Sequence, residues 1–388
     1  MVHFRNAGVL PALFGPAALC STLEHNLWEV ARVQLSPRRA RCPNGLRWLQ
    51  ALRGIQDECR DNISGSQKVD QKSRMQLDRR KFLKTIAAAG AAAALPPFRT
   101  EPPPSPGSFD FVFFTDTHIQ PELDAAHGCD MCFRKIATIK SDFAIMGGDH
   151  VFDAFGVDGT RARMVYDLYS RTEQLIGMPL HHAIGNHDVF GVLRRSGVVP
   201  TDPAYAKKMY QDRMGQTFYS FDHKGYHFVV LDSIYPTDDR LWEARVDEEQ
   251  LRWLRNDLKR LPSGAPIVAV IHCPLVTAFA SYAQVVAAAG RKYNTMTVAN
   301  APEVLEVFEH ANVLAVLQGH THVNEIVAYK NTQYITGGAV CGNWWHGSRL
   351  GTPEGFTVVS LREGKVTTRY ETYGFQSVAP DENWRPAG

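Results

Sequence analysis

The sequence predicts an α/β layered domain, and three observations indicate it. Short apolar runs recur along the chain, an amphipathic helical pattern lies between two of them, and polar residues follow the ends of five runs. Runs that are apolar throughout are typical of strands buried on both faces. Strands that alternate with helices form a sheet covered by those helices. The chain of 388 residues, 44% of them hydrophobic, can bury one large core or two modest ones.

The charge balance gives no reason to expect a charged macromolecular partner. The formal net charge is +2, from 42 Lys and Arg against 40 Asp and Glu. Because neither sign dominates, we expect no nucleic-acid partner and no binding to anionic membranes by bulk charge. No stretch reaches the roughly 18 apolar residues of a spanning helix, so we expect no integral membrane span. Seven cysteines are too few for a disulfide scaffold.

Residues 75–94 resemble a bacterial twin-arginine signal peptide. Arg79 and Arg80 precede Phe-Leu-Lys, and an alanine-rich run then ends at Ala94 before Leu-Pro-Pro. A basic helix cap followed by an alanine helix is the alternative, but the order and spacing of the parts favour the signal. We therefore expect the twin-arginine translocation machinery to export the folded chain, so that it is periplasmic or secreted. This route often carries proteins that have already received their metal.

The position of the signal predicts where the functional chain begins. Such a signal normally starts a protein, whereas 74 residues without a clear period or motif precede Met75. We expect Met75 to be the true start and residues 1–74 to be a misassigned or disordered extension. Residues 95–107 are rich in proline and are predicted to be an extended linker. The folded domain is predicted at residues 108–388.

Six strands and one clear helix are predicted within this domain. The strands are residues 109–115, 142–146, 180–184, 227–231, 266–271 and 313–317. The helix is residues 247–261, where Asp247 and Gln250 form a capping-box signature. Its apolar stripe consists of Leu251, Leu254, Leu258 and Leu261.

Five of the apolar runs end in polar residues of a kind that binds metal. These endings are Asp116-Thr117-His118, Gly147-Gly148-Asp149, Gly185-Asn186-His187-Asp188, Ile271-His272 and Gly319-His320-Thr321-His322. In an open α/β sheet, ligands bind at the carboxyl ends of the strands, so these loops are expected to meet in one crevice. Carboxylate and amide oxygens beside imidazole nitrogens suit hard or borderline divalent ions.

The number of candidate ligands predicts two ions rather than one. Seven ligands are too many for a single ion, whereas a carboxylate can bridge two. Two ions about 3.5–4 Å apart form a clamp used on phosphoryl groups. Glycines beside Asp149, Asn186 and His320 fit this arrangement, because a backbone without Cβ turns sharply and can approach an anion closely.

The five ordered blocks resemble the calcineurin-like metallophosphoesterase family over about residues 109–361. The resemblance implies a layered β-sandwich core flanked by helices, with the metal site at the carboxyl ends of the strands. Carried over by position, the first ion is held by Asp116, His118 and His322, the bridge is Asp149, and the second ion is held by Asn186, His272 and His320. Divalent or trivalent Mn, Fe or Zn all suit such ligands. Phe152 stands where purple acid phosphatases have a tyrosine, so their charge-transfer iron site is not implied.

The resemblance also implies an activity on a small-molecule phosphate ester. A metal-bound hydroxide would attack phosphorus while His187 assists the leaving group. Asp188 would accept a hydrogen bond that orients His187. The alternative is a non-catalytic metal-binding scaffold, which the complete ligand set disfavours. Phosphatase and phosphodiesterase remain open, because the pocket decides between monoester and diester.

Other residues near these blocks have two interpretations each. His150 either lines the site or pairs with Asp153. Trp344, Trp345 and His346 follow a glycine-rich stretch and are candidates for the substrate pocket, although tryptophan is more often part of a core. The stretch is similar to that of exported bacterial members of the family.

A Cys-x-x-Cys pair follows the first block. Cys129 and Cys132 would need two further ligands to form a structural zinc site. A redox role would need a thioredoxin-like context, which the sequence lacks. We therefore expect a local disulfide, formed in an oxidising compartment.

Overall fold

The computed structural model describes residues 106–283, 292–381 and 383–384. The predicted N-terminal extension, the predicted signal and residues 95–105 of the predicted linker lie outside the described residues. The last linker residues already contact the domain, because the Gly107 amide donates to the carbonyl oxygen of Lys224 at 2.8 Å.

Two mixed sheets form the centre of the domain, and the predicted strands are among their members. The five-stranded sheet has the order β13-β12-β1-β2-β3. Its strands are β1 (Phe109–Phe114), β2 (Ala144–Met146), β3 (Leu180–His182), β12 (Gly355–Arg362) and β13 (Lys365–Thr372). The six-stranded sheet has the order β10-β11-β9-β8-β5-β4. Its strands are β4 (Tyr219–His223), β5 (Tyr226–Leu231), β8 (Pro266–Ile271), β9 (Asn312–Gln318), β10 (Glu325–Tyr329) and β11 (Thr332–Thr336).

The strands that precede the predicted metal blocks are parallel neighbours. β1, β2 and β3 run parallel in one sheet, and β5, β8 and β9 run parallel in the other. Antiparallel strands extend the sheets, with β12 and β13 beside β1, β10 beside β11 and β4 beside β5. A small hairpin pairs β6 (Ile234–Pro236) with β7 (Trp242–Ala244). Parallel neighbours bring their carboxyl ends to one edge, which places the blocks together.

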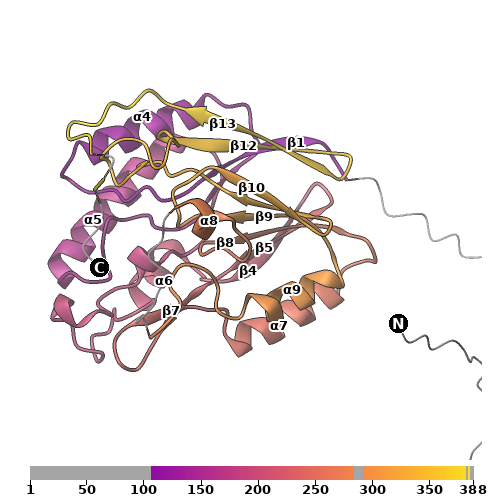
Figure 1. Cartoon of the computed structure of the whole chain (residues 1–388), viewed down its shortest axis with the longest axis horizontal. Helices are drawn as coiled ribbons and strands as arrows, with labels where there is room; N and C mark the ends of the chain where they lie inside the picture. Colours follow the sequence, from indigo (N-terminus) through magenta and orange to yellow (C-terminus); the bar gives the residue numbers. More distant parts are fainter. Residues whose placement is uncertain (1–105, 284–291, 382, 385–388) are drawn as a thin grey trace, which may run out of the picture. The chain divides into compact units, whose positions relative to one another are not determined.

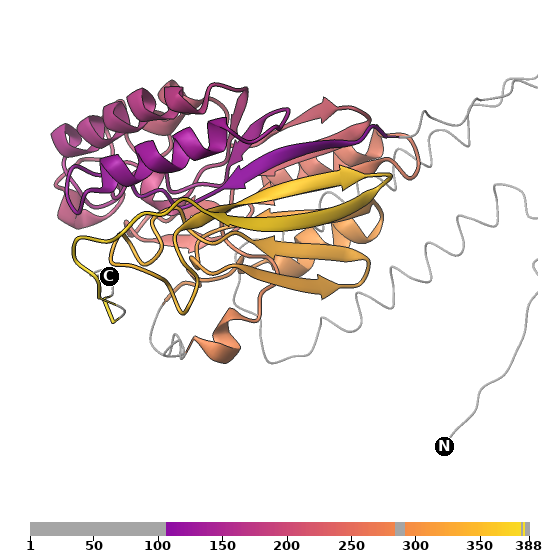
Figure 2. The ribbon, with the colours of Figure 1, turned by 90° about the horizontal axis from the view of Figure 1, so that it is seen from above.

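Helices cover the outer face of each sheet (Figures 1 and 2). The longer helices α4 (Ala125–Ala137) and α5 (Gly159–Thr172) pack on the five-stranded sheet. Helices α7 (Glu248–Lys259) and α9 (Ala301–Glu309) pack on the six-stranded sheet. The shorter helices are α6 (Lys208–Met214) and α8 (Phe279–Tyr282). The four layers confirm the predicted sandwich flanked by helices.

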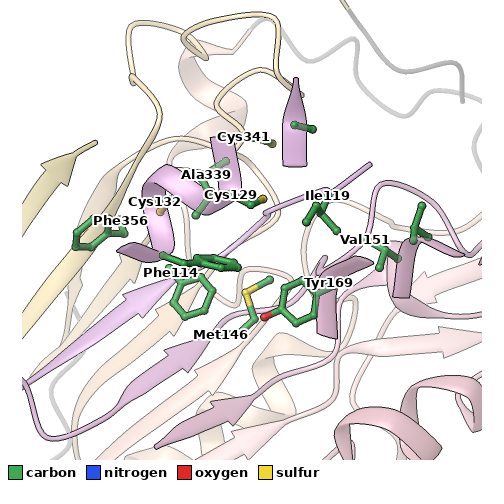
Figure 3. Close-up of a cluster of buried hydrophobic side chains, with 14 of the residues drawn as sticks. Phe114, Ile119, Cys129, Cys132, Met146, Val151, Tyr169, Ala339, Cys341 and Phe356 are labelled. Carbon is green, nitrogen blue, oxygen red and sulfur yellow. The ribbon is translucent and has the colours of Figure 1, made fainter. Parts of the chain in front are cut away.

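Alternation along β1 shows why both faces of a central strand are apolar. Phe111 and Phe113 lie in the core between the two sheets. Val112 and Phe114 point the other way, into the core beneath α4 and α5, where Figure 3 shows Phe114. Side chains alternate between the faces of a strand, so a strand covered on both sides must be apolar at every position. Each fully buried phenylalanine contributes about 1.5–3 kcal/mol.

The start of α7 corrects one part of the predicted capping box. The Asp247 side chain caps the helix as predicted, accepting the Gln250 amide at 2.8 Å. The Gln250 side chain does not reach back to the cap. It bonds instead to the amide and carbonyl of Asp232 at 2.7 and 2.8 Å, which fastens α7 to the loop after β5.

The predicted disulfide is wrong, because Cys129 and Cys132 are free thiols. They lie on one face of α4 and point into the core beside Phe114 and Met146, where Figure 3 shows them. Burial raises the pKa of both thiols well above the usual value. The thiolate is the reactive form, so this environment disfavours oxidation.

Candidate metal centre

The loops after β1, β2, β3, β8 and β9 converge, as the sequence predicted. Around the proposed first position, the Nε2 atoms of His118 and His322 lie 3.1 Å apart. Asp116 Oδ1 lies 3.3 Å from His322 Nε2 and 3.9 Å from His118 Nε2. Three ligand atoms from β1 and β9 therefore face one small space.

Asp149 lies between the two groups of proposed ligands. Its Oδ2 atom is 3.4 Å from His118 Nε2 and 3.2 Å from His272 Nε2. Its Oδ1 atom accepts the His187 amide at 2.8 Å, which fixes the carboxylate in this orientation. One oxygen thus approaches ligands of both predicted positions, as a bridging carboxylate must.

Backbone carbonyls orient three of the imidazole rings. His272 uses Nδ1 toward the Gly147 oxygen at 2.9 Å, and His322 uses Nδ1 toward the Gly342 oxygen at 2.7 Å. His320 uses Nε2 toward the Thr295 oxygen at 2.9 Å. When one ring nitrogen donates to a carbonyl, the other keeps its lone pair for a metal.

Buried polar atoms without partners mark the same place. Among the described residues, Asn186 Oδ1 and His272 Nε2, both on proposed ligands, are buried and have no hydrogen-bond partner. An unpaired buried polar group is costly, so two at one place call for a missing partner. The donor set of oxygens and imidazoles fits metal ions as that partner.

The site backbone is strained where the ligands attach. Asp116, His118, Asp149, His320 and His322 all have positive φ, between 40° and 72°. Non-glycine residues rarely adopt this region, and such strain clusters at functional sites.

Two glycines next to the ligands are needed for close approach. A Cβ atom on Gly185 would lie 2.2 Å from Asp149 Oδ1, and one on Gly319 would lie 2.3 Å from the Thr115 hydroxyl. Any side chain at either position would displace a proposed ligand or its neighbour, as the sequence predicted from the glycines beside the blocks.

Electrostatics keep the two carboxylates ionised. Burial opposes ionisation of Asp116, but His322 and His272 lower its pKa to about 2. Burial likewise opposes ionisation of Asp149, and His272 and His187 hold its pKa well below the usual value. Both groups are therefore available as anionic ligands.

The imidazoles differ in their protonation. Burial lowers the pKa of His118 well below its usual value and that of His320 to about 4. Burial also lowers the pKa of His272, but Asp149 outweighs it and raises the value to about 10. His118 and His320 can thus bind metal directly, whereas His272 must first release a proton.

Asp188 does not orient the His187 ring, contrary to the prediction. Its carboxylate accepts the backbone amides of Asp149, His150 and Gly185 at 2.8–3.0 Å. It therefore joins the loops after β2 and β3, which carry Asp149 and the third block. The reason is geometric: the chain turns into a short 3-10 helix at Asn186–Asp188, and the Asp188 side chain points back into this turn.

His150 neither lines the site nor pairs with Asp153. It is fully buried, with Nδ1 2.8 Å from Asp188 Oδ2 and Nε2 3.0 Å from His182 Nδ1. Asp153 instead accepts the amides of residues 155 and 156. His150 thus supports Asp188 from behind the metal ligands.

The His187 ring reaches the ligand group. Its centroid is 4.6 Å from that of His118, edge to face, and one of its ring nitrogens lies within 4.8 Å of ligand atoms of His118 and Asp149. It is half-buried, so it stands where the group meets solvent.

Trp344, Trp345 and His346, the candidates for a substrate pocket, have different surroundings. Trp345 is fully buried and belongs to the core, so its assignment to a pocket is wrong. His346 stacks on Trp384 at 4.7 Å and bonds to the Ala379 carbonyl, away from the ligand atoms. Trp344 is half-buried and lies on the His322 ring, with centroids 4.1 Å apart.

The sequence did not predict the groups outside the five blocks that hydrogen-bond to the proposed ligands. The Thr115 hydroxyl donates to Asp116 Oδ2 at 2.7 Å, and the Gly342 carbonyl accepts from His322. Thr115 adjoins a block and could have been suspected. Gly342 is 20 residues from His322, and no local pattern marks it.

The fold and the site define a metal-binding α/β sandwich protein. A model of the calcineurin-like phosphoesterase family matches residues 109–324, more than half of the chain. The chain belongs to the calcineurin-like phosphoesterase family, which confirms the predicted fold and resemblance.

One curated relative and two solved structures illustrate the similarity. The serine/threonine-protein phosphatase CPPED1 of Bos taurus is 31% identical over 196 residues, which cover 50% of this chain and 55% of the relative. The chain thus spans about half the length of that relative. A dimetal phosphatase from Danio rerio is 14% identical, with 67% of this chain and 98% of that chain covered and a TM-score of 0.45. GAP50, the anchor in the inner membrane complex of Plasmodium, is 15% identical, with coverages of 71% and 91% and a TM-score of 0.45.

The export signal is also confirmed. A model of the twin-arginine translocation signal matches residues 76–96, which indicates that the translocation machinery exports the chain. Within the described part of the chain, none of the helices has the length and apolar character needed to cross a bilayer.

Proposed function

We propose that the chain is a dinuclear metal-dependent phosphoesterase that acts on a small-molecule phosphate ester. The position of Asp149 Oδ2 carries the proposal, because it lies 3.4 Å from His118 Nε2 and 3.2 Å from His272 Nε2. The first ion would be held by Asp116, His118 and His322. The second would be held by Asn186, His272 and His320, through atoms that include the unpartnered Asn186 Oδ1.

Two bound ions would supply an activated water and neutralise charge on the phosphoryl oxygens. The residues of the chain have the remaining tasks. Asp149 keeps the two groups of ligands at a fixed separation, and Asp188 holds the loops that carry Asp149 and Asn186. His187 gives its proton to the leaving oxygen as the bond from phosphorus to that oxygen breaks and the oxygen of water adds to phosphorus.

The test combines metal analysis with turnover. The purified protein should bind two equivalents of Mn, Fe or Zn and hydrolyse p-nitrophenyl phosphate or its bis ester. The ratio of the two rates distinguishes a phosphatase from a phosphodiesterase. Two bound ions without turnover of either ester would favour the non-catalytic scaffold, and no metal uptake would reject the dinuclear site.

We also propose that the exported form is the domain at residues 108–388, preceded by the linker at 95–107 after cleavage of the signal at Ala94. The match of the signal model to residues 76–96 supports this division. The N-terminal sequence of exported protein tests it, and an N-terminus upstream of residue 95 would contradict cleavage at Ala94.

A further inference from the structure

A segment after the last metal block contacts every residue proposed for the first ion. We call Cys341–Trp345 the brace. It lies beyond residues 109–324, where the family model matches. We infer that the brace positions the ligands of the first ion and so sets the affinity of that position. The inference rests on the proposed dinuclear site.

Three polar contacts join the brace to three different ligands. The Cys341 amide donates to the carbonyl oxygen of Asp116 at 3.2 Å. The Gly342 carbonyl accepts from His322 Nδ1 at 2.7 Å, which directs Nε2 toward the site. The indole Nε1 of Trp345 donates to the carbonyl oxygen of His118 at 3.0 Å. The Gly342 contact is of the kind that orients a metal-binding imidazole, and the other two hold the backbone from which the Asp116 and His118 side chains project.

Trp344 adds a packing contact to the same group. Its ring lies on the His322 imidazole, with centroids 4.1 Å apart and planes at 32°. The Arg349 guanidinium lies 5.5 Å from the centroid of the Trp344 ring. The indole therefore packs on both a cation and a proposed ligand, and we expect it to restrict rotation of the His322 ring.

The brace has an unusual backbone that its contacts maintain. Trp344 and Trp345 have φ of 52° and 73°, a region that bulky residues rarely adopt. The turn is closed by the Trp345 amide, which donates to the Cys341 carbonyl at 2.7 Å. The buried Trp345 ring packs edge to face on Phe375 at 5.0 Å. Such a conformation persists where the surroundings enforce it, typically at functional sites.

The second position has no comparable support from this segment. Its histidines bond to the carbonyls of Gly147 and Thr295. Within the described ranges, no hydrogen bond joins the brace to Asn186, His272 or His320. Damage to the brace should therefore weaken one position and leave the other intact.

The test measures Mn²⁺ binding to the chelated full-length protein by calorimetry. Trp345→Phe removes the indole donor and leaves the buried His118 carbonyl without it, and should weaken the first position about 10-fold, the effect of losing one buried hydrogen bond. Trp344→Leu removes the contact with His322 and should weaken it about 2- to 10-fold. In both variants the second position should keep its affinity, and electron paramagnetic resonance should show isolated Mn²⁺ replacing spin-coupled pairs.

Trp253→Phe is the matched control. Trp253 is a partly buried tryptophan on α7 that packs against Phe218 at 5.1 Å, so this variant should bind Mn²⁺ as the wild type does. If Trp345→Phe does not fold, Trp344→Leu decides, because that side chain is half-buried. Wild-type affinities in the folded variants, or equal weakening of both positions, would overturn the inference. Wild-type protein that takes up no Mn²⁺ would instead overturn the proposed dinuclear site.

Discussion

The two proposed metal positions differ in how they meet solvent. Asp116, His118 and His322 are at most 1% exposed, and the brace covers them. On the other side, His320 is half-buried, and so is His187 next to the shared Asp149. His272 and Asn186 of the second set are also buried, so the solvent-facing edge of the site lies at His320 and His187, and we expect substrate to approach there.

The largest expected effect comes from the residue that the two positions share. Asp149→Ala should lose both ions and reduce hydrolysis to background, at least about 10³-fold, because the charge-stabilising ions are gone. Metal content by mass spectrometry and turnover check this. Asp257→Ala is the control, since this buried aspartate pairs with His227 at 2.8 Å and should keep both ions. An Asp149 variant with two ions and normal turnover would remove the bridging assignment.

Replacement of the half-buried His187 tests the role proposed for the solvent-facing edge of the site. His187→Ala should keep both ions and lower turnover of an alkyl phosphate ester about 10²–10⁴-fold, the usual worth of general acid catalysis. The loss should be smaller for p-nitrophenyl phosphate, because its leaving group needs little help from a proton.

His181→Ala provides the comparison, since His181 is a half-buried histidine that stacks on Phe221 at 3.7 Å. Equal losses on both esters with metal intact would make His187 an electrostatic stabiliser. Loss of metal would make it a ligand.

During chelation, the two proposed positions should lose their ions at different rates. With excess chelator, the ion on the open side should leave at least about tenfold faster than the enclosed ion. Activity should disappear with the first equivalent lost, because the reaction needs the pair. Metal content and activity in samples taken during chelation check this. Loss of both ions in one phase would contradict the proposed difference.

The smallest expected effect is the release of a proton when metal binds at the second position. Without metal, burial lowers the pKa of His272 but Asp149 raises it to about 10, whereas burial holds the pKa of His118 well below its usual value. At pH 8, therefore, His272 carries a proton that an ion must displace. The second position should release about one proton on binding and weaken as pH falls. Calorimetry in buffers of different ionisation enthalpy measures this, and no proton release at either position would reject the assignment.

Local patterns were sufficient for many elements. The predicted strand at residues 266–271 matches β8, because an apolar run of strand length has few alternatives when both faces are covered. The predicted strand at 180–184 ends earlier, at His182, since pairing with β2 stops there. The helix from Asp247 was also predicted, whereas the partner of the Gln250 side chain was not, because it lies on another element.

The proposed ligands could be predicted from the sequence because each lies within four residues of the end of a strand. The role predicted for Asp188 was wrong because most of its hydrogen-bond partners lie on a loop that is distant in the sequence. Its partners are chosen by the turn at Asn186–Asp188 and by the β2 loop, 38 and 39 residues away. The predicted disulfide was wrong because spacing alone does not show that both thiols face a core.

Six of the strands, the export signal and the residues that gather at the strand ends could be predicted from the sequence, because these depend on neighbouring residues and on the rule that parallel strands end together. The groups that hold those residues follow from the folded structure. The Trp345 indole meets the His118 carbonyl across 227 positions of sequence, and Asp116 meets the His320 amide across 204. Contacts of that separation follow from the packing of sheets and loops, and no local pattern encodes them.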